Sequence, residues 1–211
     1  QRPYFCTCGM GYDANVSYRF SVAARRGPIT YIEKTIAALA KYKPETYTII
    51  DQSGQHTCKA FCIALANASQ YGNNAYIAPR ASMADGLMDV TVIEPFPVAE
   101  APAMAWRLFT GKFEDGANHI RMFRTATLRI IREKEGVIHC DGDPMQAPRE
   151  INVRIVPAGL KVICDTDTLA HTQPLYQTIG QQITSLTQSA TATFRYASHE
   201  LIEHLTPKKG R

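Results

Sequence analysis

The chain has 211 residues, of which 45% are hydrophobic and 20% are charged, a composition that excludes a disordered protein. The net charge of +4 is modest, and Lys and Arg are scattered without interleaved aromatic residues, so we do not expect a nucleic-acid partner. No apolar run approaches the roughly 20 residues of a membrane span, and the N-terminus does not resemble a signal peptide.

The first half of the chain predicts strands around one helix. Residues 4–14 predict a strand that runs into a glycine-rich turn. Apolar residues at helical spacing after Gly27-Pro28 predict a helix that ends at Lys43-Pro44. Residues 46–50 and 56–66 then predict a hairpin, because turn residues separate two runs rich in β-branched side chains. Two short apolar strands follow, at 75–78 and 90–93, with an acidic turn between them.

The second half predicts a short helix and four more strands. Residues 101–109 predict the helix, with Trp106 as a core anchor. The predicted strands cover 122–131, 137–140, 151–156 and 160–164. Many short strands with two brief helices indicate a mainly β fold, a two-layer antiparallel β-sandwich over residues 1–165.

Residues 166–211 predict a linker and a helical C-terminal extension. Apolar residues from Ile179 to Leu205 recur at steps of three and four, the pattern of a long amphipathic helix. Its apolar stripe has to be buried on the sandwich, on a part of the protein outside this chain, or on a second copy, so a homodimer stays open.

Two acidic turns stand out as places for chemistry. In the first, Asp85-Gly86-Leu87-Met88-Asp89, a carboxylate and main-chain carbonyls form the kind of ligand set that Mg²⁺ or Ca²⁺ prefers. Such an Asp-Gly pair is also an ordinary hairpin turn. The second turn is His139-Cys140-Asp141-Gly142-Asp143-Pro144, at the end of a strand. A lone histidine before a turn is usually structural, so His139 is not among the predicted site residues.

These turns, together with Gly9-Met10-Gly11-Tyr12-Asp13-Ala14 and the segment 67–79, occur in an order and spacing that resemble one known family. The resemblance is to the C-terminal domain of the diacylglycerol kinase-like lipid kinases, which include bacterial diacylglycerol kinases and the sphingosine and ceramide kinases. It covers residues 1–165 and implies a two-sheet sandwich and ATP-dependent phosphorylation of a lipid hydroxyl, on a diacylglycerol-like lipid. NAD kinases share the distant architecture, but the turn motifs match the lipid kinases better.

The resemblance implies catalytic and substrate-binding roles for three carboxylates. Asp143 is the expected proton acceptor from the lipid hydroxyl, Asp141 its neighbour at the nucleotide, and Asp13 a contact to the lipid head group. The family usually has Asp-Gly-Glu where this chain has Asp141-Gly142-Asp143, so the proposed base is one methylene shorter.

The resemblance also implies a magnesium site, at the Asp85 side chain and the carbonyls of Ser82 and Leu87. ATP is the expected co-substrate. The family binds ATP on an N-terminal domain with the signature Gly-Gly-Asp-Gly, which does not occur in this sequence.

We therefore expect the lipid-binding, base-bearing half of a lipid kinase, inactive by itself, whose partners are the missing N-terminal ATP-binding domain and a lipid at a membrane surface. Six cysteines without a Cys-x-x-Cys pair favour free thiols in a reducing cytoplasm, and thus a cytoplasmic protein peripheral to the membrane. The alternative, from another functional class, is a non-catalytic β-sandwich module that binds a ligand or a partner.

Overall fold

The computed structural model describes residues 1–21, 39, 42–72, 74–161 and 163. The chain divides into two compact units, Gln1–Leu160 and Lys161–Arg211. The helix predicted after Gly27-Pro28 and the C-terminal amphipathic helix fall outside the described residues, except for single positions of the former. The fold below is that of the first unit.

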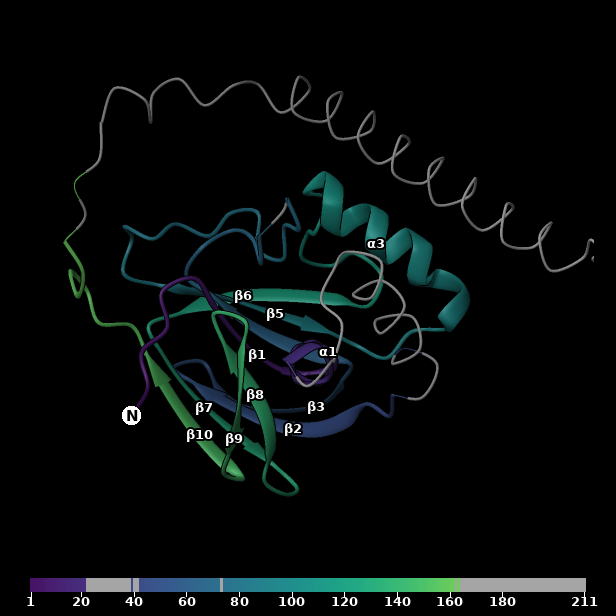
Figure 1. Cartoon of the computed structure of the whole chain (residues 1–211), viewed down its shortest axis with the longest axis horizontal. Coiled ribbons are helices and arrows are strands. Elements are labelled where there is room, and N and C mark those ends of the chain that lie inside the picture. Colours follow the sequence, from purple (N-terminus) through teal and green to yellow (C-terminus); the bar gives the residue numbers. More distant parts are fainter. Residues whose placement is uncertain (22–38, 40–41, 73, 162, 164–211) are drawn as a thin grey trace, which may run out of the picture. The chain divides into compact units, whose positions relative to one another are not determined.

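Ten strands form two antiparallel sheets in the described part of the chain (Figure 1). The larger sheet has the order β6-β5-β4-β1-β8-β9, made of Ile120–Thr125, Met88–Ile93, Cys62–Ala66, Thr7–Gly11, Gly136–Cys140 and Asp143–Ala147. The smaller sheet has the order β10-β7-β2-β3, made of Glu150–Arg154, Thr127–Arg132, Glu45–Asp51 and Gly54–Ala60. The helical elements are α1 (Tyr12–Ser21), the 3-10 turn η1 (Val98–Glu100) and α3 (Ala101–Thr110). The predicted mainly β, two-sheet antiparallel architecture is confirmed.

The main core lies between the two sheets and contains side chains from both of them. Tyr47 and Ile130 from the smaller sheet meet Met10, Ile63 and Val90 from the larger one, and each of these five is almost fully buried. Since successive side chains of a strand point to opposite faces, every second residue of the larger sheet faces away from this core.

The opposite face of the larger sheet, called the outer face below, is also covered. A second apolar cluster joins alternate residues of β4, such as Ala64, to Ile77, Met104 and Phe113. Met104 comes from α3, which lies over this side of the sheet in Figure 1. The central strands are therefore buried on both faces, and a polar side chain placed there needs a partner within the protein.

Two predicted strands are each split into two, because the chain crosses from one sheet to the other. Residues 56–66 form β3 and β4, which separate at Phe61, and residues 122–131 form β6 and β7, which separate at Ala126. At the first crossing the Phe61 amide donates to the Ile93 carbonyl at 2.7 Å, and the Phe61 carbonyl accepts from the Tyr12 amide at 3.0 Å. The first crossing coincides with a change in burial, because β3 is mostly exposed and β4 is fully buried, while the second joins two strands, β6 and β7, of mixed burial.

The segment 75–78 is not a strand, contrary to the sequence prediction. The Tyr76 amide donates to the Leu108 carbonyl at the end of α3, and the Ala78 amide donates to the Ser69 carbonyl. The first hydrogen bond connects the loop to α3, and the second connects two positions of the same loop. The predicted strand over 160–164 is not found either, since none of its described residues lies in a strand.

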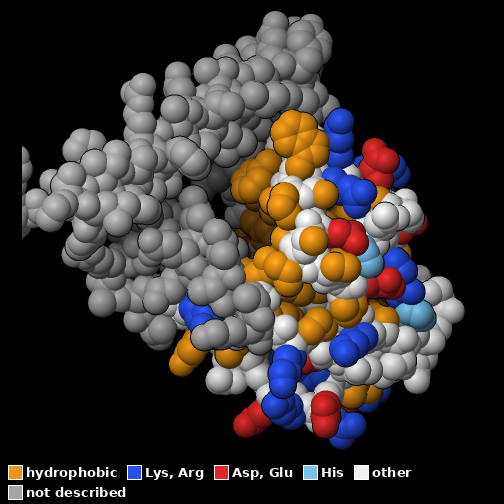
Figure 2. Space-filling model, turned by 90° about the vertical axis from the view of Figure 1, so that its right-hand side faces the viewer, with side chains coloured by type: hydrophobic (Ala, Val, Ile, Leu, Met, Phe, Trp, Pro, Cys, Tyr) orange, Lys and Arg blue, Asp and Glu red, His pale blue; other side chains and the backbone are white. Residues whose placement is uncertain are grey.

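Helix α3 confirms the predicted short helix, but Trp106 is not its anchor. Met104 is the residue of α3 that is buried, whereas the Trp106 side chain is 53% exposed, beside the exposed Phe109 and Val98. Figure 2, which shows the side of the molecule that lies to the right in Figure 1, has hydrophobic side chains next to charges of both signs. The helix turns its smaller thioether, and not its indole, toward the sheet.

Candidate functional site

The two acidic turns lie at the same end of the larger sheet. Across the strands, Arg124 pairs with Asp89, Asp89 with Ala66, and Ala66 with Thr7. The Asp141 amide then donates to the Thr7 carbonyl at 2.8 Å. Three strand spacings separate Asp89 from Asp141, about 14 Å. The fold thus brings the two turns, which are about fifty positions apart in the sequence, to the same end of the larger sheet.

The Asp141-Gly142 pair forms a two-residue turn between β8 and β9, the β8–β9 hairpin. Asp141 has φ 51° and Gly142 has φ 88°, so both residues are left-handed, as a type I′ turn requires. Asp and Gly are the residues that accept this backbone most readily, which explains why the turn occurs at this sequence.

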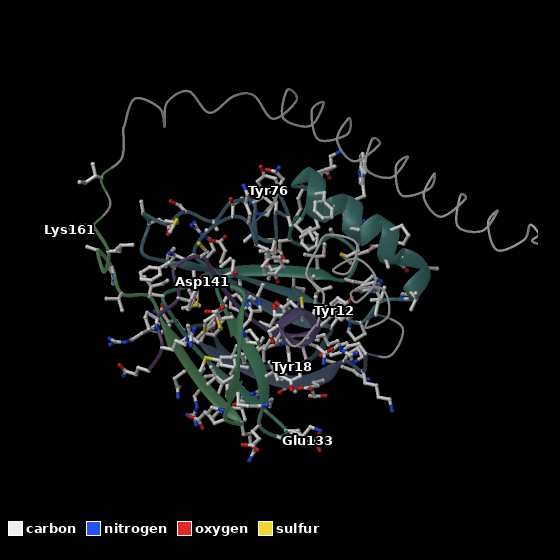
Figure 3. The ribbon with its side chains drawn as sticks, viewed as in Figure 1. Tyr12, Tyr18, Tyr76, Glu133, Asp141 and Lys161 are labelled. Carbon is white, nitrogen blue, oxygen red and sulfur yellow. The ribbon has the colours of Figure 1, made fainter. Side chains whose placement is uncertain are left out.

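The Asp141 carboxylate accepts three backbone hydrogen bonds from the N-terminal segment (Figure 3). The donors are the amides of Phe5 and Cys6 at 2.8 Å and of Thr7 at 3.0 Å. Asn67 binds the same segment from the other side, with its side-chain amide on the Phe5 carbonyl. Both Asp141 oxygens are occupied in these bonds, so the carboxylate fixes the turn to β1. Its predicted contact with the nucleotide stays a prediction.

The open end of the β8–β9 hairpin is fixed by Arg132 of β7. The Arg132 guanidinium is buried and donates at 2.7 Å to the carbonyls of Gly136 and Ala147, which close the hairpin ladder. The hairpin is therefore attached to the body of the sandwich at both ends.

Asp143 begins β9 directly after the turn, and its side chain is 76% exposed. The ion pair that the structure gives it is with Arg2, at 3.0 Å, and Arg2 is itself about half exposed. One hairpin thus carries two carboxylates in opposite situations. Asp141 is bonded to the backbone, while Asp143 faces solvent with a displaceable partner.

Asp13 lies in the first turn of α1 and is largely buried, with its side chain 13% exposed. Its Oδ1 accepts from the Ala14 amide at 2.7 Å. Its Oδ2 accepts from the Tyr71 hydroxyl at 2.9 Å and lies 3.2 Å from His139 Nε2. The predicted head-group residue is thus the centre of a polar cluster on the outer face of the sheet.

His139 is the site residue that sequence reasoning missed. It is on β8, its side chain is 3% exposed, and its Nδ1 accepts from the Gly142 amide at 3.4 Å. Burial lowers the pKa of His139, but the hydrogen bond and charge of Asp13 outweigh burial, so the pKa lies above its ordinary value. The signal in the sequence is a histidine between two core residues, Ile138 and Cys140, which places it on the other, also buried, face.

The space for the Asp13–His139 pair exists because residue 9 is glycine. Gly9 is the register partner of His139 on β1. A Cβ atom at position 9 would lie 2.0 Å from Asp13 Oδ2 and 2.4 Å from His139 Nε2, too close for either. Gly9 thus lies within β1 and not in the predicted glycine-rich turn, and its missing side chain admits two polar side chains of the protein itself.

Asp85, the predicted metal ligand, belongs to a cluster with Asp89 and Arg124, called the Arg124 cluster below. Asp85 Oδ1 accepts from the Leu87 amide at 3.0 Å, and Oδ2 pairs with the Arg124 guanidinium. Arg124 Nε also lies 3.3 Å from Asp89 Oδ2. The Asp89 side chain is 6% exposed, and burial raises its pKa although the charge of Arg124 opposes this.

This arrangement does not fit a magnesium ion at Asp85. A carboxylate and two main-chain carbonyls are suitable oxygen donors for Mg²⁺. Both Asp85 oxygens are already hydrogen-bonded, however, and the positive charge beside them is a guanidinium. Among the described residues, no group of three or more His, Cys, Asp and Glu side chains is placed to hold a metal ion. A magnesium ion would have to displace Arg124 from Asp85.

The described helices are all too short or too polar to cross a membrane. The chemistry that the site offers is an exposed carboxylate on a fixed hairpin, next to a buried polar cluster.

Residues 6–164 match the profile of a domain family described as "YegS C-terminal NAD kinase beta sandwich-like domain". Curated relatives include "Probable lipid kinase YegS-like" of Stenotrophomonas maltophilia (strain K279a), which is 23% identical over 154 residues, 73% of this chain and 50% of the relative. "Diacylglycerol kinase" of Mycobacterium tuberculosis (strain ATCC 25618 / H37Rv) is 26% identical over 159 residues, 72% of this chain and 49% of the relative.

Among solved structures, the fold resembles the crystal structure of a protein named as a diacylglycerol kinase from Bacillus anthracis str. Sterne. The TM-score is 0.52 at 19% identity, over 74% of this chain and 54% of the other. The chain spans about half the length of the curated relatives it matches.

Proposed function

Because the chain belongs to the family of YegS C-terminal β-sandwich domains, we propose that it is the lipid-binding, base-bearing half of an ATP-dependent lipid kinase that phosphorylates a diacylglycerol-like hydroxyl. The observation that carries this proposal is the contrast within the β8–β9 hairpin. Asp141 is occupied by three backbone amides, while Asp143 is exposed on the same fixed turn.

Asp143 is the proton acceptor in this proposal. Phosphoryl transfer requires an aligned hydroxyl and a base that takes its proton, with little covalent work from the protein. A base needs an accessible carboxylate held within hydrogen-bond reach of the substrate, and Asp143 is accessible while its hairpin is fixed at both ends. Arg2, the exposed ion-pair partner of Asp143, would have to give way to the lipid hydroxyl.

Asp13 contributes the contact to the lipid head group. Its Oδ2 already accepts from Tyr71 and contacts His139, so the substrate hydroxyl has to share this oxygen or replace the Tyr71 hydroxyl. A head group that competes with Tyr71 places the lipid between α1 and the β8–β9 hairpin, with its acyl chains at a membrane surface.

ATP is the co-substrate, bound mainly by an N-terminal domain outside these 211 residues. The absence of Gly-Gly-Asp-Gly from the sequence and the half-length match to the relatives support this division. We expect the coding sequence upstream of Gln1 to encode about one further domain with that signature. A reading frame that starts at Gln1 would favour the alternative, a non-catalytic module that binds a ligand or partner.

Magnesium at Ser82, Asp85 and Leu87 stays a prediction of the family resemblance, and no step of the proposed reaction uses it. A calorimetric titration of Mg²⁺ into the chain, with Asp85→Ala as the control, measures it. Binding that Asp85→Ala abolishes would support the site and would show that the ion displaces Arg124. Equal heats of binding in both proteins would exclude a magnesium site at Asp85.

Lipid binding is tested on the 211-residue chain by NMR. Diacylglycerol in detergent micelles, added to ¹⁵N-labelled chain, is expected to shift the amides of residues 12–14 and 141–143 beyond the shifts caused by empty micelles. Shifts confined to other regions, or identical with and without the lipid, would contradict the proposed binding site.

A further inference from the structure

We propose that His139 is a positioning residue that joins the proposed head-group contact, Asp13, to the turn that carries the proposed base, Asp143. The inference rests on the proposed function for the roles of Asp13 and Asp143. The contacts of His139 themselves do not depend on it. The imidazole of His139 contacts both α1 and the β8–β9 turn, which are far apart in the sequence.

Both ring nitrogens of His139 are engaged, one on each side. Nε2 lies 3.2 Å from Asp13 Oδ2, and Nδ1 accepts from the Gly142 amide at 3.4 Å. Gly142 is the residue between Asp141 and Asp143, so its position sets where β9 and Asp143 begin. In the neutral ring, an acceptor at Nδ1 places the proton on Nε2, the nitrogen that then donates to Asp13.

The imidazole has little freedom to leave this position. It is 3% exposed, and the Tyr71 ring packs edge-on against it at a centroid distance of 5.9 Å. The absence of a side chain at Gly9 lets Asp13 and His139 meet, since a Cβ there would overlap both. A buried polar pair with each atom satisfied holds its geometry more firmly than an exposed one.

The groups that act on His139 come from three elements. Asp13 from α1 is the strongest, the Tyr71 hydroxyl shares the Asp13 oxygen, and Cys140 and Asp141 follow on the hairpin. The Gly142 amide favours neutral imidazole, whereas Asp13 favours imidazolium. A change at Asp13 is therefore transmitted through the ring to the Gly142 amide, and a change at the turn is transmitted back.

Two conservative variants separate the two contacts. His139→Gln keeps a side-chain amide near the Nε2 position that can donate to Asp13, but it has no acceptor for Gly142. His139→Asn keeps an acceptor near the Nδ1 position for Gly142 but does not reach Asp13. Thr91→Val is the matched control, because it removes another buried hydrogen bond on the outer face, from Thr91 to the Ile77 carbonyl, and touches neither contact.

Transmission is measured by NMR on the 211-residue chain without any enzymatic reaction. Asp13→Asn is expected to shift the Gly142 and Asp143 amides in the wild-type and Thr91→Val backgrounds, and to leave them nearly unshifted in His139→Gln and His139→Asn. An undiminished response in both His139 variants would overturn the inference. If Asp13→Asn does not fold, the wild-type ring ¹⁵N shifts decide: neutral His139 with an unprotonated Nδ1 supports the bridge, and a protonated Nδ1 with a free Nε2 overturns it.

The consequence for the reaction is measured on the protein that joins this chain to its ATP-binding half, with Asp143→Asn as the reference. Misplacing the base predicts that His139→Gln and His139→Asn each lower kcat about 10- to 100-fold, with a much smaller change in KM for the lipid. If the Asp143→Asn protein is inactive while both His139 variants keep the wild-type kcat, the inference about His139 is wrong and the proposed function stands. A fully active Asp143→Asn would instead contradict the proposed function.

Discussion

The β8–β9 side of the larger sheet and its β5–β6 side hold their carboxylates by different means. On the β8–β9 side, Asp13 and Asp141 accept hydrogen bonds from a hydroxyl and from backbone amides, and Asp13 also contacts the imidazole of His139. On the β5–β6 side, Asp85 and Asp89 share one guanidinium, that of Arg124. The first arrangement leaves Asp143 exposed, with the exposed Arg2 as its ion-pair partner, while in the second a single positive charge is shared by two carboxylates.

The difference indicates which side can do chemistry. A carboxylate pair that shares a guanidinium is an ion pair that stabilises a loop, and a metal ion would have to compete with Arg124 for it. The β8–β9 hairpin, fixed by the side chains of Asp141 and Arg132, keeps the exposed Asp143 in a fixed place, where its partner is the exposed Arg2. The following substitutions test this comparison through the free energy of unfolding, starting with the largest expected effect.

Asp141→Asn is expected to be the most destabilising, by about 2–3 kcal/mol, because three amides lose a charged acceptor. Asn tolerates the left-handed backbone of position 141, so the turn itself is kept. Urea unfolding measures the loss, and amide hydrogen exchange should accelerate at residues 5–7. Unchanged exchange there would show that Asp141 does not hold the N-terminal segment.

Arg124→Gln is expected to cost about 1–2 kcal/mol at pH 7, less than a fully buried pair because Arg124 is partly exposed. Burial raises the folded pKa of Asp89 above its ordinary 3.8, so stability falls as the pH rises from that value through the folded pKa. Removing Arg124 raises that pKa further, and the cost should be smaller at pH 4.5 than at pH 7.

The double variant Arg124→Gln with Asp89→Asn is the control for that prediction, and it should recover most of the stability lost at pH 7.

Arg124→Gln should also bind Mg²⁺ at least about tenfold more tightly than wild type, since the ion no longer competes with the guanidinium. Equal magnesium affinity in the two proteins would show that Arg124 and Mg²⁺ do not compete for Asp85.

His139→Gln tests the pH dependence of the β8–β9 side. The folded pKa of His139 is raised above its ordinary 6.5, so the His139–Asp13 contact stabilises fully below that value and loses its contribution as the pH rises through the folded pKa. The difference between wild type and His139→Gln should shrink from pH 5.5 to pH 8, by at most about 1.4 kcal/mol per pH unit. A difference that grows with pH would contradict the direction of the shift.

Asp143→Asn should have the smallest effect, under about 0.5 kcal/mol, because it removes an exposed ion pair with Arg2. Thermal unfolding of the variant should match wild type. A large loss of stability would mean that Asp143 belongs to the framework of the hairpin, as Asp141 does.

The sequence allowed the strand-rich fold and the two acidic turns to be predicted, because both depend on local patterns. It did not show the crossings at Phe61 and Ala126, because a change of sheet depends on which strands pair; at Phe61 the chain passes from the mostly exposed β3 to the fully buried β4. Nor did it separate Asp141 from Asp143, since the distinction depends on amides more than 130 positions away.

The magnesium site stays a prediction, and the sequence did not show the partner of Asp85 for a similar reason. The turn at Asp85 has suitable oxygen ligands in its own sequence, but the guanidinium that pairs with it comes from β6, at Arg124. His139 was missed because its partners, Asp13 on α1 and Gly9 on β1, are far from it in the sequence and meet it only in the folded chain. Long-range register, and not local composition, decides what each carboxylate does.

The most direct test of the account is phosphate transfer from ATP to diacylglycerol in mixed micelles, by the protein that joins this chain to its ATP-binding half, with and without Asp143→Asn. The account predicts that the variant unfolds like wild type and transfers phosphate at least about 100-fold more slowly. A folded Asp143→Asn protein that phosphorylates the lipid at the wild-type rate would contradict the assignment of Asp143 as the base.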